Sequence, residues 1–153
     1  MAMLIRITRI PYEEPHHVQL RYEVSNGRQS WQFEYFENAT ELAAFGDNLI
    51  AFPRHNTDVF LYEVGSERPE DRWGYYFRFR AFVISNTGQC AIQIRFNNNE
   101  ALPDNEQFEF CLRAAPAQIE RLGKLYQAFA KLEDEVLEWS GNEGQLHRYA
   151  VSA

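Results

Sequence analysis

The sequence predicts an α+β fold in which antiparallel strands form one or two sheets and two amphipathic helices pack against them. Two segments alternate apolar and polar residues on either side of a turn, and two others repeat apolar residues at spacings of three and four. The first pattern is typical of half-buried strands and the second of helices with one buried face. Both patterns occur once in each half of the chain, in the same order.

The first hairpin is predicted from residues 18–36. Its apolar positions alternate with polar ones, and they are Val18, Leu20, Tyr22 and Val24 before the turn and Trp31, Phe33 and Tyr35 after it. Asn26-Gly27 favours a two-residue turn, because both residues tolerate positive φ. Such a turn would place Leu20 opposite Phe33 and Tyr22 opposite Trp31, so that one face is apolar and the other polar.

A second hairpin is predicted around the turn Ser85-Asn86-Thr87-Gly88. A four-residue loop there places Phe77 opposite Phe96 on the apolar face and Arg78 opposite Arg95 on the other face.

Each hairpin precedes a predicted helix. Asn38 followed by Glu41 forms a capping-box pattern at the start of the first helix, and Pro53 marks its end. Pro116 is favoured in the first turn of the second helix. The apolar stripes of the two helices are Leu42, Phe45, Leu49 and Phe52 in the first, and Ile119, Leu122, Tyr126 and Phe129 in the second.

These patterns suggest an internally duplicated β-β-β-α-β unit. Adding 77 to the residue number maps Gly46 onto Gly123 and carries the helix stripe and the following strand along with it. The expectation is a single domain over 1–153, with repeats at 1–66 and 73–141 and a tail at 142–153. The predicted strands are 3–10, 18–24, 29–36, 58–64, 75–84, 89–96, 106–112 and 135–140, and the predicted helices are 39–52 and 116–132.

Composition narrows the classes of partner and compartment. The formal net charge is −7, and an acidic chain repels phosphate backbones at long range, which predicts no nucleic-acid partner. No apolar run reaches the length that crosses a bilayer, so no membrane partner is predicted, and the N-terminal segment lacks the apolar core of a signal peptide. The expected location is the cytoplasm, where Cys90 and Cys111 would stay reduced inside strands.

One loop combines carboxylates with imidazoles. Glu13, Glu14, His16 and His17 are residue types that bind zinc and other divalent ions, and they form the candidate metal site. Their spacing matches no established ligand pattern, so the alternative interpretation is a solvated loop that leads into a strand. No cofactor is predicted.

A second candidate site lies on the polar face of the second hairpin. Arg78, Arg80 and Arg95 should cluster there, with Trp73 just before the hairpin, and the interpretation is an anion-binding or partner-binding surface. Because Arg78 and Arg95 repel when directly opposite, the alternative is a structural ladder with carboxylates from neighbouring strands. The carboxylates available for such a ladder are Glu34, Glu63 and Glu109.

No nucleophile motif or phosphate-binding loop occurs, so the sequence does not predict an activity. The leading hypothesis is a non-catalytic protein that acts on another protein, a regulatory protein or a bacterial immunity-type protein, with a homodimer as a further expectation. The alternatives are a small-ligand binder with a cleft between the two repeats and a metal-dependent enzyme that uses the loop from Glu13 to His17.

Overall fold

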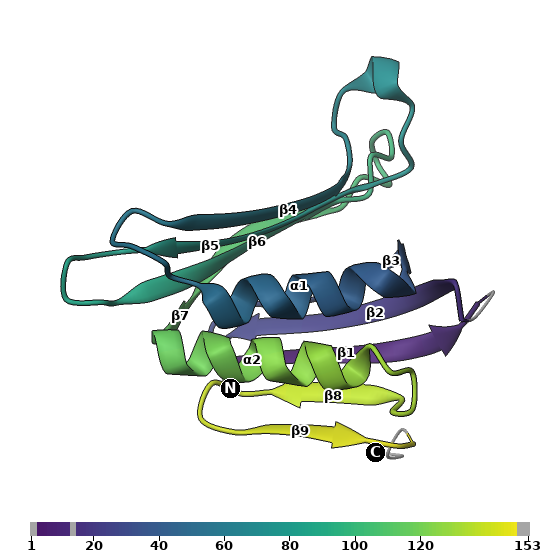
Figure 1. The fold of residues 1–153 in the computed structure, drawn as a ribbon. Helices are drawn as coiled ribbons and strands as arrows, with labels where there is room; N and C mark the ends of the chain where they lie inside the picture. Colours follow the sequence, from purple (N-terminus) through teal and green to yellow (C-terminus); the bar gives the residue numbers. More distant parts are fainter. Residues whose placement is uncertain (1–2, 13–14, 150–153) are drawn as a thin grey trace.

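The computed structural model describes residues 3–12 and 15–149 and contains two antiparallel sheets and two helices (Figure 1). Sheet A consists of β1 (Met3–Pro11), β2 (His17–Asn26), β3 (Ser30–Asn38), β8 (Val136–Trp139) and β9 (Gly144–His147). Sheet B consists of β4 (Val59–Gly65), β5 (Tyr76–Val83), β6 (Cys90–Asn97) and β7 (Gln107–Ala114). The helices are α1 (Ala39–Ala51) and α2 (Pro116–Phe129), and a short 3₁₀ helix, η1 (Pro69–Asp71), lies between β4 and β5. The predicted fold class is confirmed.

The strand order interlocks the two halves of the chain. Sheet A has the order β3-β2-β1-β8-β9 and sheet B the order β4-β5-β6-β7. The strand after each helix therefore joins the sheet of the other half, since β4 pairs with β5 and β8 pairs with β1. In each half, three strands lead into a helix, so the two halves occupy equivalent places in the topology. The internal duplication itself remains a prediction.

The two hairpins differ in how well their register was predicted. The second hairpin has the predicted pairs, Phe77 with Phe96 and Arg78 with Arg95. In the first hairpin the predicted register is wrong by two residues, because Tyr22 pairs with Phe33 rather than with Trp31. The Asn26 side-chain Oδ1 accepts hydrogen bonds from the backbone N–H groups of residues 28 and 29, so the turn forms one residue later than expected. A shift of two keeps every side chain on its predicted face.

The C-terminal elements also differ from expectation. The predicted tail contains β9, which pairs with β8. The second helix ends at Phe129 rather than at residue 132, where Leu132 has φ +60°. Cys111 is exposed, whereas Cys90 is buried as expected. Among residues 3–12 and 15–149, no helix combines the length and the hydropathy needed to traverse a bilayer.

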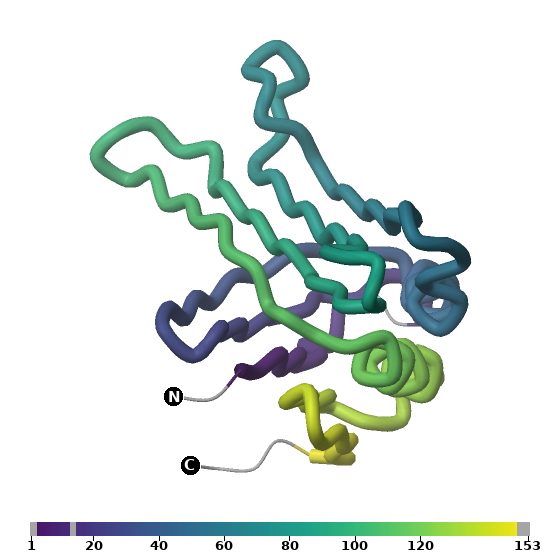
Figure 2. The backbone as a smooth tube through the Cα atoms, turned by 90° about the vertical axis from the view of Figure 1, so that its left-hand side faces the viewer, coloured from purple at the N-terminus to yellow at the C-terminus, as the bar shows by residue number. Residues whose placement is uncertain are grey.

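One hydrophobic core joins both sheets and both helices. The helices lie side by side and cover part of sheet A, while sheet B crosses above them (Figures 1 and 2). Phe45 of α1 contacts Phe79 of sheet B and Tyr126 of α2 with ring centroids 4.8 and 4.3 Å apart. The two matched glycines lie in direct contact where the helices cross, since a Cβ on Gly46 would lie 2.6 Å from the Gly123 carbonyl oxygen.

Candidate functional sites

Along each strand of sheet B, the side chains that alternate with the core positions form one surface, which we call the outer face of sheet B. Its residues are Val59, Leu61 and Glu63 of β4, Tyr76, Arg78, Arg80 and Phe82 of β5, Ala91, Gln93, Arg95 and Asn97 of β6, and Gln107, Glu109, Cys111 and Arg113 of β7. Neither helix lies over this side of the sheet in Figure 1. The charged side chains of this face fall into two parts, one in which they form ion pairs and one in which they do not.

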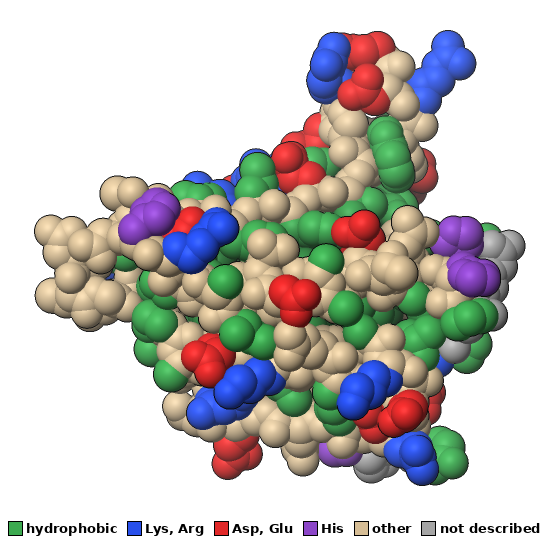
Figure 3. Space-filling view, in the orientation of Figure 1, with side chains coloured by type: hydrophobic (Ala, Val, Ile, Leu, Met, Phe, Trp, Pro, Cys, Tyr) green, Lys and Arg blue, Asp and Glu red, His purple; other side chains and the backbone are tan. Residues whose placement is uncertain are grey.

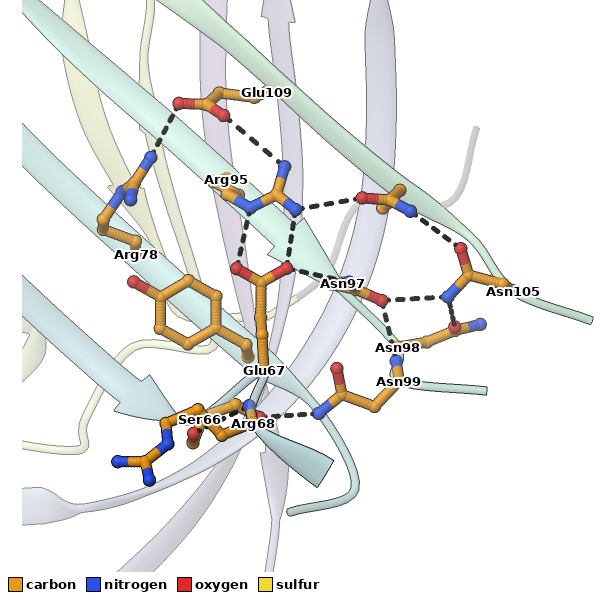
Figure 4. Close-up of polar contacts among 12 residues, drawn as sticks. Ser66, Glu67, Arg68, Arg78, Arg95, Asn97, Asn98, Asn99, Asn105 and Glu109 are labelled. Carbon is orange, nitrogen blue, oxygen red and sulfur yellow. Dashed lines mark hydrogen bonds and ion pairs between the residues drawn. The ribbon is translucent and has the colours of Figure 1, made fainter. Parts of the chain in front are cut away.

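The paired part contains two of the three predicted arginines (Figure 4). Arg78 donates to Glu109 at 2.6 Å, and Arg95 lies 3.4 Å from the other oxygen of the same carboxylate. Arg95 also contacts Glu67 at 2.6 Å and thereby holds the pKa of Glu67 below its ordinary value. The carboxylates remove the repulsion between the facing arginines, as the structural alternative expected.

Of the three carboxylates proposed for that ladder, only Glu109 takes part. Glu63 accepts a hydrogen bond from Tyr76 at 2.6 Å, and Glu34 lies on sheet A next to Arg21. Glu67 was not expected because it lies in the loop that contains η1.

The same network fixes two long loops against each other. Asn97 donates to Glu67, and the Asn99 side chain donates to the backbone carbonyls of Ser66 and Trp73 at 2.8 and 3.0 Å. These bonds join the loop that contains η1 to the loop between β6 and β7. Acidic and basic side chains gather at the tip of the first loop (Figure 3). The exposed Trp73 lies in this loop, with its ring edge-on to Tyr75 rather than among the arginines.

The unpaired part of the outer face carries two free guanidinium groups. Within the described ranges, neither Arg80 nor Arg113 forms an ion pair, and the buried Nε of Arg80 has no hydrogen-bond partner. Arg80 lies over the ring of Phe82 with its Cζ 4.4 Å from the centroid. Val59 and Leu61 on β4 are 47% and 49% exposed beside these two residues. Cationic and apolar groups are therefore exposed together.

A cleft of about 570 Å³ lies where β3 enters α1, beside β4. It is lined by Tyr12, His17, Phe36, Glu37, Asn38, Glu41, Tyr62, Glu63 and Val64. Glu37 is only 7% exposed, and its two carboxylate oxygens accept hydrogen bonds from Tyr35, at 2.7 Å, and from Tyr62. Because Tyr62 belongs to sheet B and Glu37 to sheet A, this carboxyl joins the two sheets.

Burial dominates the electrostatics of Glu37. Loss of solvation raises the pKa of its carboxyl from 4.5 to about 7, although the hydrogen bonds from Tyr62 and Tyr35 act in the opposite direction. Desolvation by burial, together with the nearby Glu37 carboxylate, raises the pKa of both tyrosines. Glu37 therefore changes its charge near neutral pH.

The second half of the chain has a cleft at the equivalent place. The helix α1 begins at residue 39 and α2 at residue 116, 77 residues later. The cleft at the start of α2 has a volume of about 460 Å³ and is lined by residues 87–90, Arg113, Ala114, Ala115, Pro116 and Gln118. In this numbering, Arg113 replaces Phe36 and Ala114 replaces Glu37. One cleft is acidic, and the other is bordered by an unpaired arginine.

Only part of the predicted metal-binding loop lies within the described residues. His16 and His17 are exposed at the start of β2, and Glu13 and Glu14 lie outside the described residues. Among the residues that the structure does describe, no three His, Cys, Asp or Glu side chains are grouped closely enough to hold a metal ion. His17 lines the acidic cleft.

Sequence reasoning missed Glu37 and Arg113. A usable signal existed for Glu37, since Trp31, Phe33, Tyr35 and Glu37 occupy alternate positions of one strand and must share a face. A carboxylate at the end of an apolar series is expected to be buried. Arg113 gave no comparable signal, because an exposed arginine in a strand is ordinary.

The likeness to solved structures is weak. No family model and no curated protein matches the sequence. The chain is similar to the plant transcriptional regulator PBF-2 and to WHY3 from Arabidopsis thaliana, each with 10% identity and a TM-score of 0.47. The likeness covers 83% of this chain in both cases, and 72% and 78% of the respective neighbours. At this level it assigns no activity to the chain.

These neighbours nevertheless contradict the expectations of a protein-interaction function and of no nucleic-acid partner, since one neighbour is described as a transcriptional regulator. The physical error lay in the use of net charge. A sum of −7 over the whole chain does not describe an individual face, and Arg80 and Arg113 form no ion pair within the described ranges.

Proposed function

We propose that the chain binds single-stranded nucleic acid on the unpaired part of the outer face of sheet B. The observation that supports this is the half-buried Arg80 and the exposed Arg113, which form no ion pair within the described ranges, next to Phe82 and two exposed aliphatic side chains. Single strands are bound by surfaces that combine cations for the phosphates with apolar or aromatic platforms for the bases. The Arg80 guanidinium, which already lies on an aromatic ring, can also stack on a base.

The geometry favours a single strand over a duplex. The face is a broad four-stranded sheet, and the exposed groups reach across it from Leu61 on β4 to Arg113 on β7. A duplex presents its phosphates outward and keeps its bases stacked inside, so the apolar groups of this face would have no partner. Unpaired bases can lie flat against them.

The test is a titration of a fluorescently labelled mixed-sequence oligonucleotide, read by anisotropy at low salt, with the matching duplex as comparator. We expect saturable binding of the single strand and weaker binding of the duplex. The double variant Arg80→Gln/Arg113→Gln should reduce the slope of log K against log salt by about 1.4, because about 0.7 is lost per phosphate contact on a single strand.

Arg21→Gln is the matched control, since Arg21 lies on the outer face of sheet A, paired with Glu34 at 3.2 Å. It should leave binding within twofold of the wild type. Absence of binding by the wild type, or a double variant that binds with the wild-type affinity and salt slope, would refute the proposal.

A further inference from the structure

The acidic cleft at the β3–α1 junction cannot serve the proposed nucleic-acid face. Glu37, Glu41 and Glu63 all line it, so it repels phosphate groups. Its lining also includes three aromatic residues, Tyr12, Phe36 and Tyr62. Tyr12 and Phe36 meet edge to face with their centroids 5.1 Å apart.

The buried carboxyl retains capacity to accept hydrogen bonds. A carboxylate offers about four acceptor positions on its two oxygens. The tyrosine hydroxyl groups of Tyr35 and Tyr62 take two of them. A ligand in the cleft could therefore donate to Glu37 without displacing either tyrosine. The preferred donor is a cation, since a hydrogen bond between two charged groups is stronger than one between neutral groups.

We infer that this cleft binds the ammonium group of a small organic amine, with Glu37 as the anionic contact and the rings of Phe36 and Tyr62 as walls. The rings add attraction for the cation through their negatively polarised faces and pack against its alkyl chain. A volume of about 570 Å³ lies within the range of small-molecule sites. The inference is independent of the nucleic-acid proposal, because it uses other residues and another face.

The equivalent cleft in the second half lacks these features. Ala114 and Ala115 stand where Glu37 and Asn38 stand in the first half, and Gln118 stands in place of Glu41. Arg113 would repel an ammonium group. The acidic and aromatic character therefore belongs to the first junction and does not follow from the topology that the two junctions share.

The test is isothermal titration calorimetry of the whole chain with n-butylammonium chloride at pH 8 and constant ionic strength, with n-butanol and butyrate as comparators. We expect saturable binding of n-butylammonium and at least tenfold weaker binding of the two comparators. Glu37→Gln should lose at least tenfold in affinity. Glu106→Gln, an exposed carboxylate on a loop outside this cleft, should bind as the wild type does.

A second measurement distinguishes a direct contact from a structural effect of Glu37. At pH 7 the wild type should release up to about half a proton for each n-butylammonium bound, because a carboxyl with a pKa of about 7 is about half protonated there. The release is detected by repeating the titration in buffers of different ionisation enthalpy. Glu37→Gln should release none. The titratable groups that face the ligand are Glu37, Glu41, Glu63, His17, Tyr12 and Tyr62.

Phe36→Ala removes an exposed wall without disturbing the core, and it should weaken binding several-fold. The inference is overturned if n-butanol binds as well as n-butylammonium, or if Glu37→Gln retains wild-type affinity and proton release. Tighter binding of a blocked lysine peptide than of n-butylammonium would overturn the small-amine assignment. Loss of oligonucleotide binding in Arg80→Gln/Arg113→Gln has no bearing on this result.

Discussion

The two strand-to-helix junctions occupy equivalent places in the topology and carry opposite chemistry. At the first, Phe36 and Glu37 stand just before the last residue of β3, and the carboxyl is buried and held by two tyrosines. At the second, the strand ends in Arg113 and Ala114, and the arginine projects from the outer face of sheet B without an ion-pair partner within the described ranges. A shared backbone plan therefore does not determine which ligand a junction suits.

The difference lies in the partners around each position. Adding 77 to the numbers of Tyr35 and Tyr62 leads to Leu112 and Trp139. The indole N–H of Trp139 already donates to the backbone carbonyl of Gln118 at 2.9 Å. A buried carboxylate is tolerated only where hydrogen-bond donors meet it, and the second junction provides none of the equivalent hydroxyl groups.

The largest expected effect comes from placing a carboxylate at the second junction. Ala114 is 4% exposed, so Ala114→Glu would bury a charge without partners and should lose about 3 to 5 kcal/mol of unfolding free energy at pH 8 relative to Ala114→Gln. The glutamine variant controls for the added volume. Urea denaturation of both variants measures the difference, and the two should converge at low pH. Equal stability at pH 8 would break the comparison.

A smaller effect concerns the pH dependence that Glu37 imposes. Its carboxyl has a pKa of about 7 in the folded chain against 4.5 ordinarily, so the folded state binds more protons between these values. The stability contribution is full below pH 4.5 and is lost as the pH rises through about 7, by roughly 3 kcal/mol. Urea denaturation from pH 5 to pH 8 should show this decline in the wild type and a flatter profile in Glu37→Gln. Identical profiles would contradict the assignment.

The smallest expected loss of stability comes from substituting either of the two helix glycines, and it should be the same in both halves. Gly46→Ala and Gly123→Ala each place a Cβ less than 3 Å from the opposite helix's backbone oxygen. Overpacking costs about 1 to 3 kcal/mol, offset in part by about 1 kcal/mol of helix propensity. Each variant should therefore have a Tm lower by a few degrees in a thermal melt. Gly74→Ala, with open space around the glycine, should change little, and unequal losses from the two helix variants would show that the helices do not meet symmetrically.

The sequence predicted most of the local structure because the relevant signals are short-range. Alternation gave the faces of β2, β3, β5 and β6, and the spacing of apolar residues gave both helices. It missed β9, whose four residues carry no alternation strong enough to mark a strand, and whose pairing depends on β8. The predicted register of the first hairpin was wrong by two residues, because the Asn26 side chain accepts the hydrogen bonds of the turn. Two registers that differ by two residues place the same side chains on the same face, so the alternation cannot distinguish them.

The candidate sites were predicted less well, since they depend on contacts between distant segments. Arg78 and Arg95 were correctly placed opposite each other. No local pattern indicates that Glu67, from a loop, contacts Arg95 and leaves Arg80 as the unpaired member. The cleft at Glu37 requires β4 of one sheet to lie beside β3 of the other.

The sequence by itself determined which residues lie on which face of each strand and helix, because those periods are fixed by backbone geometry. Only the tertiary structure decided that the fourth strand of each half joins the other half's sheet, and hence which tyrosine reaches Glu37. The charge state of a carboxyl and the freedom of an arginine depend on solvent and on neighbours brought together from far apart in the chain. Neither is encoded in local spacing.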